Sequence, residues 1–196
     1  NVWNEIIAFS SPDLMVEVVD RLNLHTDYRK PGFFYNKLLY GTSLPITVSM
    51  PDLADNAAAS FTIKLLGKEK YVITDMTFNG EEFENKKIEG RLHDTITSPY
   101  GSLIVSPTIH YNIQLATETN EILVTRTRKS YAVEKYSNRL GVEQNNKEAD
   151  VITLFVNDVS PQRAEDFLNT LIVVYNEHWI KDKNQIANST SIFIND

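Results

Sequence analysis

The stretch from Asp150 to Asp196 constrains the fold more than any other part of the chain. Residues 151–156 form a nearly continuous apolar run, which is typical of a strand covered on both faces. Ser160-Pro161 then predicts the start of a helix, because a serine hydroxyl can accept a hydrogen bond from an orphan N–H and proline loses nothing at the first helical position. The upstream chain must therefore supply surfaces against which this strand and helix can be buried.

This helix is predicted to run from Pro161 to about Asn188. At ~1.5 Å per residue it is roughly 40 Å long, which is more than a small domain usually needs. Its apolar residues recur at the spacing of one helical face and are expected to face the core: Phe167, Leu168, Leu171, Ile172, Tyr175, Trp179 and Ile186. Ser191–Asn195 is interpreted as a short strand that returns to the sheet.

The upstream sequence divides into helical and strand-like regions. Helices are predicted at 2–8, from Ser11-Pro12 onward, at 33–40 and at 130–140. Between Ile46 and Val124 the apolar residues alternate or form short β-branched runs, which predicts strands at 46–50, 61–65, 71–73, 103–105 and 121–124. Asn79-Gly80 is either a hairpin turn or a looser loop.

These patterns predict an α+β fold. Its base domain, built on a mixed sheet, spans residues 1–196 and carries the long C-terminal helix. An antiparallel β subdomain is inserted in this base at about residues 45–125.

Composition limits the classes of function. The net charge is −7 at a pI near 5.1, with no basic stripe, so nucleic acid is not an expected partner. The chain has no cysteine and therefore no thiol chemistry, and no apolar run of about 18 residues that could span a membrane. Because it begins with Asn1 and not with methionine, we expect an excised fragment whose flanks hold the membrane anchors.

No group of residues predicts bond chemistry, so we expect no catalytic residue, no cofactor and no metal. Four histidines are scattered singly along the chain: His25, His93, His110 and His178. His93-Asp94 could be a general-base pair, but it lacks a nucleophile motif, and the acidic run 81–84 fits a solvated loop better than paired acids. Arg126, Arg128 and Lys129 form the only local basic cluster, either a solvated edge or a contact for anionic lipid or acidic glycan.

Several segments resemble one known family in their order and spacing. The carriers at the C-terminal end are Ser160, Pro161, Ala164, Leu168-Asn169, Leu171, Tyr175, Ala187, Phe193 and Ile194. Upstream carriers are the helix at 130–140 with Gly141-Val142-Glu143 and a polar turn at 144–148, the opening helix at 10–24, and Tyr40–Val48. The chain resembles the periplasmic base domain of polysaccharide co-polymerases, the Wzz/Wzc-like chain-length determinants, while residues 50–120 match no motif of that family.

The resemblance implies a function without bond chemistry in this segment. Base domains of this family pack in a ring on the periplasmic face of the bacterial inner membrane and regulate the length of capsular, exo- or O-antigen polysaccharide. The implied partners are other copies of the parent protein, the membrane through flanking helices, and a polysaccharide polymerase or exporter. The parent would carry a cytoplasmic tyrosine-kinase domain in the Wzc-like branch. The expected interfaces are the polar faces of the helices that begin at Ser11 and Pro161.

Two alternatives remain open from the residues alone. One is a periplasmic or surface glycan-binding module that presents Tyr71, Phe78, Phe83 and Tyr100 to a sugar. The other is a glycoside-acting enzyme that uses Glu82 or Asp94.

Overall fold

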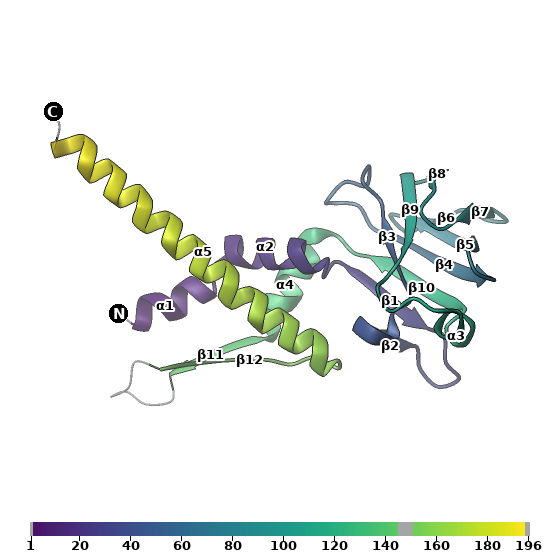
Figure 1. Cartoon of the computed structure of the whole chain (residues 1–196), viewed down its shortest axis with the longest axis horizontal. Coiled ribbons are helices and arrows are strands. Elements are labelled where there is room, and N and C mark those ends of the chain that lie inside the picture. Colours follow the sequence, from purple (N-terminus) through teal and green to yellow (C-terminus); the bar gives the residue numbers. More distant parts are fainter. Residues whose placement is uncertain (1, 145–150, 195–196) are drawn as a thin grey trace. The chain divides into compact units, whose positions relative to one another are not determined.

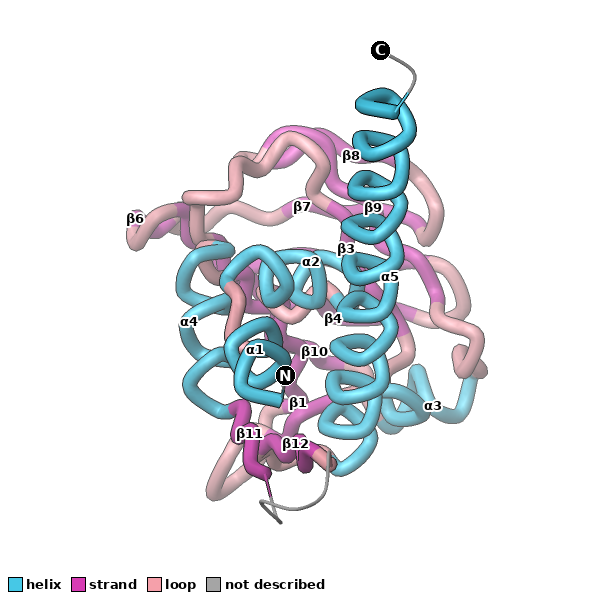
Figure 2. Tube along the Cα trace, turned by 90° about the vertical axis from the view of Figure 1, so that its left-hand side faces the viewer, coloured by secondary structure: helices cyan, strands magenta, loops and turns pink. Residues whose placement is uncertain are grey.

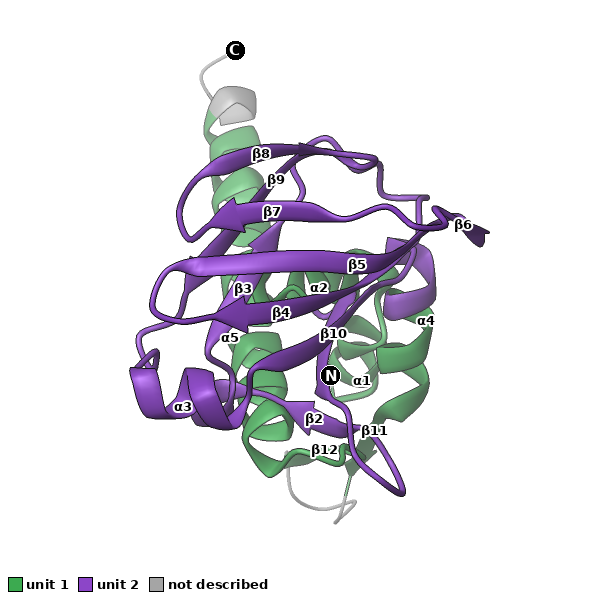
Figure 3. Cartoon of the chain, turned by 90° about the vertical axis from the view of Figure 1, so that its right-hand side faces the viewer, with its two compact units in different colours: residues 1–23, 133–196 green, residues 24–132 purple. Residues whose placement is uncertain are grey.

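A computed structural model of the chain describes residues 2–144 and 151–194 and divides it into two compact units (Figure 3). Unit 1 combines the two ends of the chain, residues 1–23 and 133–196, and unit 2 is the continuous segment Leu24–Ala132. The β-rich stretch predicted at 45–125 lies within unit 2, which begins earlier and ends later. The α+β class, the inserted antiparallel subdomain and the long C-terminal helix are confirmed.

Unit 1 contains four helices and one hairpin among the described residues (Figure 1). Its helices are α1 (Val2–Phe9), α2 (Pro12–Leu22), α4 (Lys129–Arg139, whose first turn belongs to unit 2) and α5 (Pro161–Ile194). Strands β11 (Leu140–Gln144) and β12 (Ile152–Val156) pair antiparallel. The predicted mixed sheet is therefore wrong: every strand pairing within the described residues is antiparallel, and no parallel crossover is formed.

The core of unit 1 forms between α2 and α5. Both helices begin at a Ser-Pro pair, as predicted, and the Ser160 hydroxyl caps α5 by accepting a hydrogen bond from the Arg163 N–H at 3.2 Å. The fully buried side chains come from one face of each helix and from α4: Leu14, Met15, Val18, Val19, Tyr136, Phe167, Leu171 and Val174. Tyr136 and Phe167 stack with ring centroids 5.3 Å apart, so α4 closes the core against α5.

Strand β12 is less covered than predicted. Its Phe155 side chain is exposed, because a two-stranded hairpin has no second layer on its outer face. Phe155 instead lies opposite Gly141 of β11, where the absence of a side chain leaves room for the ring. The polar turn predicted at 144–148 lies outside the described residues from Asn145 onward.

Helix α5 is longer than predicted and continues unbroken to Ile194 (Figures 1 and 2). The strand predicted at Ser191–Asn195 is thus wrong within the described residues. The Ser189 and Thr190 hydroxyls donate to the carbonyls of Gln185 and Ile186, each at 2.9 Å. These bonds satisfy the polar side chains within the helix, and no glycine or proline follows Pro161 to end it.

Unit 2 is built from two antiparallel sheets. The larger has the order β2 (Lys37–Leu39), β1 (Thr26–Lys30), β10 (Glu121–Arg126), β4 (Ala59–Leu66), β5 (Lys70–Phe78) and β6 (Glu81–Glu82), with β7 (Ile88–Arg91) also paired to β5. The smaller has the order β3 (Ile46–Ser49), β9 (Gly101–Pro107) and β8 (Thr95–Ser98). A 3₁₀ turn (Gly41–Ser43) and helix α3 (Ile113–Glu118) complete the unit.

One hydrophobic core joins the two sheets of unit 2. Ile63, Ile73 and Ile122 of the larger sheet and Leu103 and Val105 of the smaller sheet are fully buried in it. The Val48 N–H donates to the Tyr28 hydroxyl at 2.8 Å, which links a strand of one sheet to a strand of the other. Burial raises the pKa of Tyr28 to about 12.

Turn chemistry explains one correct prediction in unit 2, and strand pairing explains one wrong prediction. Asn79-Gly80 forms the two-residue turn between β5 and β6, with positive φ at both residues, as a type I′ hairpin requires. The helix predicted at 33–40 is wrong: Lys37–Leu39 is strand β2, and Leu39 pairs with Tyr28. Pairing with β1 overrides the weak helical spacing of these residues.

Candidate interaction surface on the C-terminal helix

A stripe of apolar side chains lies exposed along α5. Its members are 42–67% exposed: Ile172, Val173, Trp179, Ile180 and Ile186. The prediction that Trp179 belongs to the core is wrong, and so is the assignment of Ile172 and Ile186 to the core-facing side. The buried side of α5 carries Phe167, Leu171 and Val174 instead, so the helix has two apolar sides and only one is covered within unit 1.

The members of this heptad stripe repeat every seven residues. The repeat begins with the adjacent pair Ile172-Val173. It continues seven residues later with Trp179-Ile180 and after seven more with Ile186-Ala187. In sequence the repeat continues to Phe193-Ile194. A seven-residue apolar repeat is the pattern by which one helix packs along another. The seven-residue repeat is present in the sequence, but the prediction of a single apolar face on this helix does not account for it.

The polar sides of α2 and α5, which the family resemblance predicts as interfaces, contact each other inside unit 1. Arg21 of α2 pairs with Glu17 at 2.5 Å and with Glu177 of α5, and His178 of α5 lies 2.7 Å from Glu17. Hydrogen bonds from His178 and Arg21 lower the pKa of Glu17, and hydrogen bonding from Arg21 lowers that of Glu177. These four side chains hold α2 against α5 and are less available to a neighbouring molecule.

A buried ion pair fixes the first turn of α5. Arg163 donates from Nε to Oδ2 of Asp158 at 2.7 Å and from Nη2 to Oδ1 at 2.8 Å, and both side chains are 5% exposed or less. The Ser160 N–H adds a third bond to this carboxylate at 3.0 Å. A bidentate pair of this kind positions the helix start rigidly with respect to β12.

The predicted basic cluster is only partly free in unit 2. Lys129 forms an ion pair with Asp55 at 2.9 Å, and this hydrogen bond lowers the pKa of the Asp55 carboxyl. Arg126 is half-buried at the end of β10, and Arg128 is exposed. The charge of Arg126 also acts on Asp55, so two members of the cluster lie near this carboxylate, and Arg128 is the member whose side chain is exposed.

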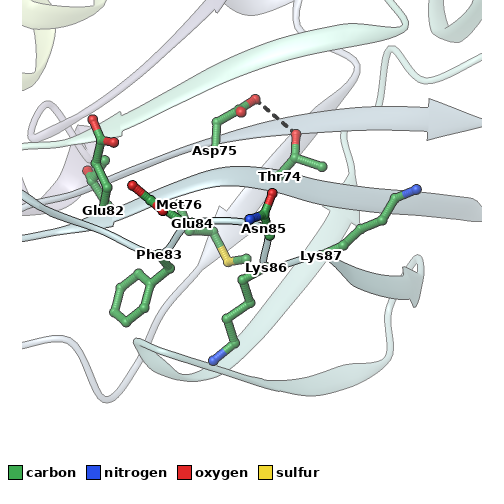
Figure 4. A pocket seen from close by; sticks show the side chains of 10 residues that line it. Thr74, Asp75, Met76, Glu82, Phe83, Glu84, Asn85, Lys86 and Lys87 are labelled. Atoms are coloured by element: carbon green, nitrogen blue, oxygen red, sulfur yellow. Dashed lines mark hydrogen bonds between the residues drawn. The ribbon is translucent and has the colours of Figure 1, made fainter.

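A hollow of about 420 Å³ lies between β5 and the segment 82–87 (Figure 4). Glu82 and Glu84 of the acidic run 81–84, which could supply paired acids, line its wall. Figure 4 shows that the labelled side chains point in different directions, with Asp75 and Glu82 on one side and Phe83 and Lys86 on the other. Glu82 and Glu84 are both exposed to solvent there, as expected for a solvated loop.

His93 and Asp94 form a backbone corner between β7 and β8. His93 has a positive φ of 71°, and its N–H donates to the Val105 carbonyl at 2.9 Å. The neighbouring hollow of about 450 Å³ is also lined by Arg91, which pairs with Glu69 at 2.6 Å. No serine of the described residues lines this hollow, and the hydroxyl of Tyr111, which does, donates to the Lys68 carbonyl at 2.6 Å.

The aromatic residues proposed for a glycan-binding module belong to the core. Tyr71 is 1% and Tyr100 3% exposed, and Phe78 and Phe83 are partly buried against the same core. The Tyr100 hydroxyl donates to the carbonyls of Ser60 at 3.0 Å and Thr77 at 2.8 Å. The rings of Tyr71 and Tyr100 consequently offer no open face for stacking on a sugar, whereas Phe78 and Phe83 are partly exposed.

No group of three or more His, Cys, Asp or Glu side chains in 2–144 and 151–194 could hold a metal ion. Across the same ranges, every helix is too short or too polar to cross a bilayer. No protein-family model and no curated protein matches the chain.

Proposed function

We propose that this chain is the periplasmic base domain of a membrane-anchored polysaccharide co-polymerase of the Wzz or Wzc type. It acts through assembly with other copies and performs no bond chemistry itself. The observation that carries the proposal is the exposed heptad stripe on a helix of 34 residues. A long helix that leaves its own domain with an uncovered apolar side fits the extended, partner-contacting helix of that family.

The arrangement of the resembling segments supports the same proposal. The opening helix, the helix at 129–139 with β11, and β12 with α5 come from the two ends of the chain and belong to unit 1. Ser160 caps α5, and Ala164 and Leu171 lie on its covered side. Most motif residues thus serve the construction of unit 1. Unit 2, with its own core, holds the remaining resembling segment, Tyr40–Val48, together with residues 50–120, which match no family motif.

The size of the stripe indicates how strongly isolated copies associate. Covering the exposed half of each of its five side chains contributes about 1 kcal/mol per residue, or about 5 kcal/mol together. Association in solution costs about 4–15 kcal/mol in lost translational and rotational freedom. The isolated chain is therefore expected to be monomeric, and assembly depends on the raised effective concentration that membrane anchoring provides.

The test uses the full-length parent protein in its native host. Trp179→Ser with Ile180→Ser removes the centre of the stripe, and Lys181→Ser with Asn188→Ser, on the opposite side of the same helix, is the matched control. We expect the first pair to shift the length distribution of the surface polysaccharide on gels at unchanged protein level, while the control pair does not. An unchanged distribution for the stripe variant would overturn the proposal, and saturable oligosaccharide binding by the purified chain would favour a glycan-binding module instead.

A further inference from the structure

The loop between β1 and β2 in unit 2 exposes three consecutive aromatic side chains. Phe33 is 94%, Phe34 90% and Tyr35 75% exposed. Such a contiguous aromatic group is unusual on a soluble surface and marks a site of interaction with a partner or a membrane. The loop projects from the end of its hairpin (Figure 3).

The backbone of this aromatic loop is tightly folded. A Cβ atom on Gly32 would lie 2.2 Å from the Tyr35 carbonyl oxygen, so only glycine fits there. The Arg29 guanidinium donates to the Asn36 carbonyl at 3.4 Å, and the Phe33 and Phe34 rings meet edge to face at 4.8 Å. The aromatic side chains are consequently held outward by the fold and do not collapse onto unit 2.

Positive charge surrounds the base of the loop. Lys30 and Lys37 lie directly opposite each other in the β1–β2 register. Lys30 donates to a backbone carbonyl, that of Glu118, and Lys37 forms no ion pair within the described ranges. The sequence from Tyr28 to Pro51 contains no acidic residue, although the whole chain carries 26.

We propose that this aromatic loop inserts into the interfacial region of a lipid bilayer with anionic headgroups. Aromatic rings prefer the headgroup level of a membrane, and the tyrosine hydroxyl can remain hydrated there. Lys30 and Lys37 then lie at the level of the lipid phosphates, where each cation near an anionic surface strengthens binding. The inference stands on unit 2 alone and does not depend on the proposed function, which is carried by α5 of unit 1.

Flotation of the purified chain with phosphatidylcholine vesicles tests the inference. One set of vesicles contains about 30% phosphatidylglycerol, which is enough anionic lipid to produce a substantial surface potential, and the other set contains none. Phe33→Ser with Phe34→Ser should weaken binding to the anionic vesicles about tenfold per ring, the order expected when a buried aromatic side chain is lost. Lys30→Gln and Lys37→Gln should each weaken it about fivefold, and added salt should do the same. Phe33, Phe34 and Lys37 are exposed, and Lys30 is half-buried with its ammonium bonded to the Glu118 carbonyl, so circular dichroism should confirm that each variant is folded before its binding is compared.

The matched control is Ile109→Ser. Ile109 is 96% exposed in the same unit but stands apart from any other exposed aromatic residue, and its replacement should leave vesicle binding unchanged. The inference is wrong if the wild-type chain does not float with anionic vesicles, or if the Phe33/Phe34 variant floats equally well. Loop-dependent self-association without vesicle binding, seen by sedimentation, would also overturn it. None of these outcomes bears on the polysaccharide-length test.

Discussion

Replacement of Asp158 by alanine should destabilise unit 1 severely. It removes three hydrogen bonds from one buried carboxylate: two from Arg163, at 2.7 and 2.8 Å, and one from the Ser160 N–H at 3.0 Å. A hydrogen bond to a charged group contributes about 1.5–3 kcal/mol when measured singly. Because these three share one acceptor group they are not additive, and the value for breaking a buried ion pair, about 3–5 kcal/mol, is the better expectation.

The reason for this large cost is the charge that remains. Arg163 is 5% exposed and cannot lose its proton, so Asp158→Ala leaves an unpaired guanidinium in the interior. Arg163→Met should cost a similar amount because it leaves the carboxylate of Asp158 unpaired. The double variant should cost clearly less than the sum of the two, since neither charge is then present.

Urea denaturation followed by circular dichroism measures these costs. The control is Glu69→Ala, which breaks an ion pair between two well-exposed side chains and should cost under about 1 kcal/mol. A cost below about 1 kcal/mol for Asp158→Ala, or strictly additive single and double variants, would refute the reasoning.

The same pair predicts a pH dependence. Burial raises the pKa of the Asp158 carboxyl, but hydrogen bonds from Arg163 and Ser160 lower it by more, so that the pKa in the folded chain is below its ordinary value. The unfolded chain then binds more protons, and the pair stabilises the fold above about pH 4 and ceases to do so as the pH falls through the folded-state pKa. The difference in stability between the wild-type chain and the Asp158→Ala/Arg163→Met variant should therefore shrink on acidification below about pH 4.

Two further predictions concern unit 2. Gly90→Ala should destabilise it by about 1–3 kcal/mol, because the new Cβ would lie 2.4 Å from the buried ring of Tyr71. Glu89→Ala, on the exposed side of the same strand, should have little effect. Equal urea midpoints for the two variants would contradict this prediction. Tyr100→Phe should cost about 1–2 kcal/mol by removing the hydroxyl that bonds two backbone carbonyls. Burial raises the pKa of Tyr100 to about 12. The contribution of its hydroxyl to stability should therefore be present below about pH 10 and lost between about pH 10 and 12. A phenolate absorption spectrum that shows Tyr100 ionising near pH 10 in the folded chain would contradict this raised pKa.

The sequence predicted the elements that local chemistry specifies. The Ser-Pro starts of α2 and α5 and the Asn79-Gly80 turn each depend on a few adjacent residues, and all three are confirmed. Strand β1, with the sequence TDYRK, was not predicted, because its single buried residue, Tyr28, gives no alternating pattern. Such a strand exists through its pairing with β10 and β2, which no local pattern reveals.

Burial was harder to predict than secondary structure. Tyr100 follows a proline in a turn, a position usually near the surface, yet the structure places its ring in the core of unit 2. Trp179 lies on the apolar face that the sequence predicts for its helix and is therefore expected in the core, but the structure leaves its side chain 51% exposed. In both cases the outcome depends on where other segments lie, which the periodicity of one element does not encode.

The two apolar sides of α5 indicate the kind of partner that covers the heptad stripe. An undistorted α-helix drifts by about 20° per seven residues from a strict heptad repeat, so the stripe from Ile172 to Ile186 turns slowly around the helix axis. Over the two heptads from Ile172 to Ile186 the drift adds up to about 40°, which a flat sheet would not follow. A second helix that coils around α5 with a left-handed twist would follow the stripe along its whole length. Residues 181–191 are exposed on all sides, so nothing within the described residues prevents such a helix from lying along this end of α5.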